Sequence, residues 1–146
     1  MACKNMKLSL FFYLLTMLGC QSNRIFIPGN YQGKYIAVGN GGGFTGKTTI
    51  YYLLDDGKIY KGSDFSNEFV HLGSLGKSFS MQQWEIYNQQ NLADRELNDP
   101  GNFYYFLEFR NVKNTKKYVW HNIEQDHEII ETIYLNINRK IQLFLE

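Results

Sequence analysis

Four residues in the glycine-rich stretch 39–48 match the phosphate-binding pattern G-x-x-x-x-G-K-[ST]. They are Gly41, Gly46, Lys47 and Thr48. In a phosphate-binding loop, backbone amides at the start of the following helix wrap the phosphates, the lysine reaches the outer phosphates and the hydroxyl holds Mg²⁺. The first hypothesis for this chain is therefore nucleotide binding.

The residues that follow the pattern argue against that hypothesis. Residues 49–54 are rich in threonine, isoleucine and tyrosine, which favour a strand. They end at Asp55-Asp56-Gly57, a strong signal for a tight hairpin turn. This spacing leaves no room for a helix after the glycines, nor for the crossover helices that join parallel strands. We therefore predict that the glycines form the tip of a β-hairpin and that the chain binds no nucleotide.

Two interpretations of this tip remain open, and they differ in the position of Phe44. In the first, which we favour, the glycines permit a wide turn and Phe44 packs into the core, because a lone aromatic side chain is more often buried. In the second, Phe44 and Thr45 project from the tip to contact a partner. The second interpretation makes Gly42, Gly43, Phe44 and Thr45 the candidate binding residues.

A second group of potentially reactive side chains surrounds the start of the last predicted helix. Its members are His121, Glu124, Asp126, His127 and Glu128. Histidines and carboxylates can bind zinc, but this spacing matches no established zinc signature. Acidic residues at a helix N-terminus also complement the helix dipole. We predict no metal site here.

The remaining histidines and the absence of two familiar hydrolase motifs also argue against a reactive site. His127 and Glu131 are four residues apart and would form an exposed pair on one helix face. His71 is isolated, and we interpret it as a structural residue. Neither G-x-S-x-G nor H-E-x-x-H occurs in the sequence. We predict neither catalytic residues nor a cofactor.

The first 19 residues have the features of an export signal. Lys4 and Lys7 precede an apolar run at residues 8–18, and a small residue, Gly19, follows it. The run is shorter than the roughly 20 apolar residues that a transmembrane helix needs. Translation could begin at Met1 or at Met6, and both starts leave the same cleavage point.

The end of this signal, Met17-Leu18-Gly19-Cys20, resembles the lipobox of bacterial lipoproteins. The resemblance implies that Cys20 is lipidated and becomes the new N-terminus. It also implies three acyl chains on this residue, which would insert in the membrane and make the membrane a binding partner. Such an anchor is firm, because stable anchoring takes two or more chains. Residues 20–32 would form the lipidated cysteine and its tether. Since no acidic run follows Cys20, we expect an outer-membrane anchor facing the periplasm.

The mature chain has the size of one globular domain, and its charge does not favour nucleic-acid binding. Removing 19 of the 146 residues leaves 127. The signal contains two of the 15 basic residues, so 13 remain against 14 acidic ones, which argues against a nucleic-acid partner. No cysteine follows Cys20, so a hydrophobic core without disulfides must stabilise the domain.

The pattern of residues 33–146 predicts an α+β fold. Strands are expected at residues 34–38, 47–54, 58–61, 68–72, 102–110 and 117–120. A helix capped by Ser78 or Ser80 is expected to bury Met81, Trp84 and Tyr87. A second helix begins at residue 124 and carries an apolar stripe made of Ile130, Ile133, Tyr134, Ile137, Ile141 and Phe144. Together these elements predict an antiparallel sheet of about five or six strands with two helices packed on one face, as a single domain.

Two resemblances bear on function. Residues 41–46 with residues 52–57, then Pro100-Gly101-Asn102 and Val119-Trp120, resemble a group of small Bacteroidetes lipoproteins without an assigned activity, across most of residues 33–146. The motif Gly42–Gly46 before a hairpin is also similar to emfourin-type inhibitors of thermolysin-like metallopeptidases, which are small cystatin-like α+β domains. That likeness implies a peptidase as partner, although emfourins lack this kind of anchor and the equivalent of Lys47.

We therefore expect a lipid-anchored envelope protein whose domain is a non-catalytic binding module of unknown ligand. The alternatives are a protease inhibitor of the emfourin type and a structural envelope protein. A binding module should expose an apolar patch at the glycine loop.

Overall fold

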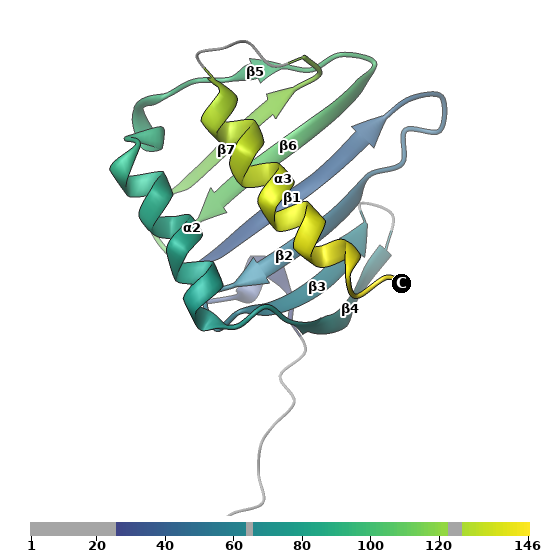
Figure 1. The fold of residues 1–146 in the computed structure, drawn as a ribbon. Coiled ribbons are helices and arrows are strands. Elements are labelled where there is room, and N and C mark those ends of the chain that lie inside the picture. The colour runs from purple at the N-terminus through teal and green to yellow at the C-terminus, as the bar shows by residue number, and fades with distance from the viewer. Residues whose placement is uncertain (1–25, 64–65, 123–126) are drawn as a thin grey trace, which may run out of the picture.

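Seven strands form one mixed sheet in the order β4-β3-β2-β1-β6-β7-β5 (Figure 1). The computed structural model describes residues 26–63, 66–122 and 127–146. The strands are β1 (Tyr35–Gly42), β2 (Thr49–Leu54), β3 (Lys58–Ser63), β4 (Ser66–Ser74), β5 (Asn98–Asp99), β6 (Phe103–Arg110) and β7 (Thr115–Trp120). The helices are α2 (Lys77–Gln89) and α3 (Glu128–Gln142), with short 3₁₀ turns at Pro28–Asn30 and Leu92–Asp94. The predicted α+β class is confirmed, with β5 as an unexpected strand that runs parallel to β7.

The first three strands form the predicted meander, and a tight turn joins β2 to β3. Between β2 and β3, Gly57 adopts φ +89° and its amide donates to the carbonyl of Leu54 at 3.0 Å. The Asp56 carboxylate accepts hydrogen bonds from the amide and the ammonium of Lys58, at 3.0 and 2.7 Å. These contacts explain why Asp-Gly was a reliable signal here.

Strand β1 is longer than expected and lies at the centre of the sheet, between β2 and β6. Residues 39–42, which we predicted as loop, continue the strand, and all four lie opposite aromatic residues of β6. Gly39 pairs with Phe106 and Gly41 with Tyr104. A Cβ at Gly39 would lie 2.6 Å from the Phe106 ring and 2.2 Å from the Thr49 carbonyl oxygen. The glycines therefore make room for aromatic side chains that close over the backbone.

Both helices cover the same face of the sheet (Figure 1), as predicted. The buried side of α3 carries the expected stripe: Ile130, Ile133, Tyr134, Ile137 and Ile141. This stripe packs into the same core as residues of β1, β2 and β6, including Ile36, Leu53 and Phe109. Phe144, which we had assigned to the stripe, lies beyond the end of α3 at Gln142 and is 38% exposed.

Helix α2 differs from its prediction at its start and in the side that it buries. It begins at Lys77 after Gly76, and no side chain caps it, so the expected caps at Ser78 or Ser80 are wrong. Ser80 is instead buried with Gln83 and Trp84, whereas Met81 is 54% exposed. Residues three apart drift around a helix of 3.6 residues per turn. With Trp84 packed on Phe109, Met81 falls outside the buried side.

Candidate functional site

The glycine loop between β1 and β2 is the first candidate site, and it is the tip of a hairpin. Asn40 pairs with Thr49, and the strand β2 follows the motif directly, so the predicted hairpin is confirmed. Lys47 is exposed at the tip, while Thr48 is buried against the sheet. The helix N-terminus that a phosphate-binding loop requires is therefore replaced by a strand.

The base of the loop is fixed and its tip is open. Gly42, Gly43 and Gly46 adopt φ angles of +92°, +70° and +62°, which L side chains rarely take. The Gly43 amide donates to the Asn102 carbonyl at 2.6 Å, which ties the loop to the chain before β6. The Gly46 amide donates to the Gly43 carbonyl at 3.2 Å and closes the turn.

The side chain of Phe44 lies at this tip and is fully exposed, with a relative accessibility of 108%. The favoured expectation, that Phe44 packs into the core, is therefore wrong. Figure 1 shows the reason, because the hairpin extends beyond the neighbouring strands and neither α2 nor α3 reaches it. Thr45 is exposed too, and its hydroxyl accepts a 3.5 Å hydrogen bond from the Lys47 amide. Phe103, opposite Gly42 on β6, is 48% exposed and adds a second aromatic side chain at this end.

Of the histidines that we considered as metal ligands, His121 contacts Asp99. His121 Nδ1 lies 3.2 Å from Asp99 Oδ2 and 3.0 Å from the Asp99 carbonyl oxygen. Glu124 and Asp126 fall outside the described residues. In residues 26–63, 66–122 and 127–146, no group of three or more His, Cys, Asp or Glu side chains could hold a metal ion.

The two other histidine interpretations need correction. His127 and Glu131 are both half-buried, so they are not the exposed pair that we expected. His71 is exposed on β4 and its ring packs at 5.1 Å on that of Tyr60, so it is a surface residue with an aromatic neighbour.

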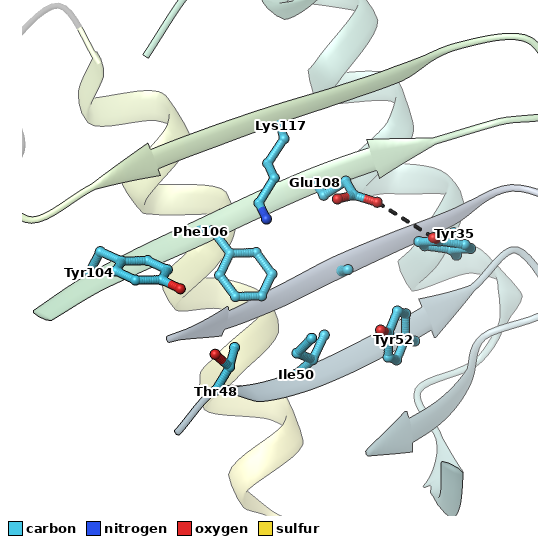
Figure 2. Close-up of a pocket in the computed structure, with 9 residues that line it drawn as sticks. Tyr35, Thr48, Ile50, Tyr52, Tyr104, Phe106, Glu108 and Lys117 are labelled. Carbon is cyan, nitrogen blue, oxygen red and sulfur yellow. Dashed lines mark hydrogen bonds between the residues drawn. The ribbon is translucent and has the colours of Figure 1, made fainter. Parts of the chain in front are cut away.

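A second candidate site, which the sequence analysis missed, lies on the sheet face opposite the helices (Figure 2). A cavity of about 90 Å³ opens there over Ala37 of the central strand. Its walls come from β1, β2, β6 and β7: Tyr35, Thr48, Ile50, Tyr52, Tyr104, Phe106, Glu108 and Lys117. The small side chain at Ala37, between larger neighbours, leaves the space. The sequence feature that could have indicated this cavity is the placement of aromatic residues on both faces of β6.

Polar groups gather at the two ends of this cavity. At one end a Cβ on Gly41 would lie 2.8 Å from the Tyr104 hydroxyl and 2.9 Å from Thr48 Oγ1, so both hydroxyls lie over the glycine. At the other end are Glu108 and Lys117, which occupy paired positions on β6 and β7. Thr48 is buried and Glu108 is half-buried, so these two side chains have defined positions, whereas Lys117 is exposed.

Glu108 and Lys117 turn apart, although they are directly opposite. Within the described residues they form no ion pair with each other. The Tyr35 hydroxyl donates to Glu108 Oε1 at 3.5 Å, and Lys117 Nζ lies 4.5 Å from the centre of the Phe106 ring. Burial raises the pKa of Tyr35, and the hydrogen bond that Arg110 Nη1 donates to its hydroxyl at 3.1 Å opposes this rise.

The chain before β1 packs on the same open face. Phe26 is only 4% exposed, and its ring centre lies between 4.8 and 6.2 Å from those of five aromatic residues: Tyr31, Tyr35, Tyr52, Tyr60 and Phe69. The Tyr31 hydroxyl donates to the Asp55 carboxylate, and Arg110 Nη1 donates to the Pro28 carbonyl. Part of the segment that we assigned to the tether therefore packs on the domain, through Phe26 and the contacts of Pro28 and Tyr31.

The predicted signal at residues 1–19 and the lipidation site at Cys20 fall outside the described residues. Among the helices of the described ranges, none is both long and apolar enough to cross a membrane. Comparison with protein-family models and with curated proteins finds no match to this chain.

Proposed function

We propose that this chain is an exported, lipid-anchored binding module that contacts a protein partner through residues 42–45 and performs no catalysis. The observation that carries the proposal is the full exposure of Phe44 at the tip of a hairpin. An aromatic ring held in water contributes nothing to the core. Large aromatic side chains are, however, the common anchors of protein interfaces, where they fill a pocket on the partner.

The architecture around Phe44 suits this role. The hydrogen bond between Gly43 and Asn102 fixes the base of the loop, so the tip is presented at a defined place. A projecting hairpin tip can enter a cleft, and an active-site cleft of a peptidase has that shape. A phenyl ring has no reactive atom, and for this reason we propose binding in place of catalysis. An emfourin-type inhibitor is one version of this module.

The proposed anchor would hold the domain close to the membrane. Only residues 21–25 separate Cys20 from Phe26, and Phe26 is locked into the aromatic cluster of the open face. An extended chain spans at most about 3.3–3.6 Å per residue, so the tether reaches roughly 20 Å. This reach would keep the domain near the bilayer, and we propose the outer membrane facing the periplasm because no acidic run follows Cys20.

Affinity capture from the native envelope tests the proposal. The bait is the chain of residues 21–146, compared with Phe44→Ala and with a control, Val112→Ala. Val112 is 70% exposed in the turn between β6 and β7, at the other end of the sheet. We expect a protein that binds the native and Val112→Ala baits and is lost from Phe44→Ala.

The other outcomes separate the alternatives. Equal capture by all three baits would contradict the loop as contact surface. A captured metallopeptidase that the purified domain inhibits would identify the emfourin-type function. If none of the baits retains a protein, the structural envelope role becomes the better explanation.

A further inference from the structure

The cavity over Ala37 has a composition that the proposed role of the glycine loop does not use. Its floor and sides are apolar where Ala37, Ile50 and Phe106 meet. Its ends carry one acceptor-only group, the Glu108 carboxylate, and one donor-only group, the Lys117 ammonium. The hydroxyls of Thr48 and Tyr104 can each donate and accept.

This set of groups selects a ligand by its charge. One carboxylate and one ammonium cancel, so the cavity offers no net attraction to an anion or a cation. The ligand must both accept from Lys117 and donate to Glu108, and it must also meet two hydroxyls at the opposite end. A neutral molecule with several hydroxyl groups satisfies all four, because each of its hydroxyls both donates and accepts.

The apolar part of the cavity selects the rest of the ligand. Binding sites for small molecules combine apolar walls with a few polar groups that fix orientation. The C–H groups of a sugar ring would contact Ile50 and the edge of Phe106. The cavity of about 90 Å³ takes the edge of such a ring, and a second cavity of about 530 Å³ that shares Ile50 and Tyr52 leaves room for further sugar units.

The cavity is also formed in advance. Ala37, Thr48 and Phe106 are buried, and the glycines of β1 hold Phe106 and Tyr104 in place over the backbone. Because the side chains of Glu108 and Lys117 turn away from each other, their charged atoms lie at separate points of the cavity lining (Figure 2). Preorganised groups lose little entropy when a ligand arrives.

We propose that this cavity is a saccharide-binding site in which Thr48, Tyr104, Glu108 and Lys117 hydrogen-bond hydroxyls of the bound saccharide. The inference does not depend on the partner of Phe44, because the cavity and the loop tip use different side chains. Phe44→Ala should leave saccharide binding unchanged, so the two proposals can fail separately.

Calorimetric titration of the purified mature protein with three neutral probes tests the site: chitotetraose, cellotetraose and maltotetraose. Tyr104→Phe removes one hydroxyl, and its control is Tyr105→Phe, whose neighbouring ring faces the helices on the other side of the sheet. Lys117→Met removes the ammonium, and its control is Lys113→Met in the turn after β6. Loss of one hydrogen bond should weaken binding by about tenfold in Tyr104→Phe and Lys117→Met, with both controls unchanged.

Three results would overturn the site. The first is that millimolar concentrations of all three sugars give no binding. The second is that a sugar binds equally well to Tyr104→Phe, Lys117→Met and their controls. The third is that glycine, a small zwitterion that could bridge Glu108 and Lys117, competes with the sugar or binds in its place. Unchanged melting temperatures would show that the variants are folded.

Discussion

Gly39 and Phe106 lie directly opposite each other on β1 and β6, and the phenyl ring covers the glycine. Gly41 and Tyr104 repeat the arrangement two residues further along the same strands. Glycine in a strand interior usually weakens a sheet, because it has no side chain to pack. Here the aromatic neighbours supply that packing, and Gly41, the first residue of the phosphate-binding pattern, has a structural role in a central strand.

Gly39→Ala should destabilise the domain by about 1–3 kcal/mol or more, which is the usual cost of overpacking a core. The new Cβ would lie 2.2 Å from the Thr49 carbonyl oxygen, and backbone cannot move aside as a flexible side chain can. Urea unfolding measures the change. Gly29→Ala is the control, since nothing lies within 4 Å of its Cβ, and it should change stability by less than about 0.5 kcal/mol. Equal stability of both variants would contradict the packing of Phe106 on Gly39.

Phe26 and Phe44 form a matched pair of phenylalanines, one buried and one exposed. Phe26→Ala should cost about 3–5 kcal/mol, because it empties the space between five aromatic rings. Phe44→Ala should change stability by less than about 0.5 kcal/mol. Chemical denaturation of the two variants under the same conditions makes the comparison. A large loss of stability in Phe44→Ala would mean that the ring is packed and cannot serve as a free anchor.

Much of this fold could be predicted from the sequence. The strand pattern and the Asp-Gly turn identified six strands, and apolar residues at helical spacing identified the buried stripe of α3. The two residues of β5 were missed because so short a strand has no periodicity. Phe44 was misplaced for a different reason. Whether a loop residue is buried depends on how far the hairpin extends past the neighbouring strands. That length depends on the pairing of β1 with β6, and it could not be predicted because the glycines at the end of β1 resemble a loop.

The second candidate site could not be predicted for a similar reason. Glu108 and Lys117 are nine positions apart, and their meeting depends on the register between β6 and β7. The cavity itself results from one small residue, Ala37, in a row of larger ones. Such a site becomes visible only when strand order and register are known.

Mg-ATP should not change the melting temperature of the purified domain. A ligand that binds only the folded state stabilises it by RT ln(1 + L/Kd), where L is the free ligand concentration, and so raises the melting temperature. Lys47 is exposed at a hairpin tip and Thr48 is buried beside Tyr104, so the two do not converge on a helix N-terminus. Differential scanning fluorimetry with and without millimolar Mg-ATP measures the melting temperature and tests this prediction. A rise of several degrees would restore the nucleotide hypothesis.

Stability should fall as the pH rises through the range in which buried tyrosines ionise. Burial raises the pKa of Tyr134 from 10.0 to about 12, while a hydrogen bond with Asn40 opposes the rise. Between these two values the unfolded chain loses the phenol proton and the folded chain keeps it. The unfolded state therefore binds fewer protons, and the free energy of unfolding decreases as the pH rises from about 10. Tyr134→Phe should show a shallower decrease in urea titrations at successive pH values, and an identical slope would contradict this assignment.

Cys20→Ala should release the protein from the membrane fraction or block its processing, if Cys20 is the lipidated residue. The matched control is Cys3→Ala, since Cys3 lies in the predicted signal and would be removed with it. Fractionation followed by mass spectrometry of the mature N-terminus distinguishes the two variants. Because stable anchoring takes two or more acyl chains, loss of the modified cysteine leaves nothing in the proposed mature chain to replace it. A Cys20→Ala protein that is fully processed and stays membrane-bound would contradict the lipid anchor, and with it the placement of the domain within roughly 20 Å of the bilayer.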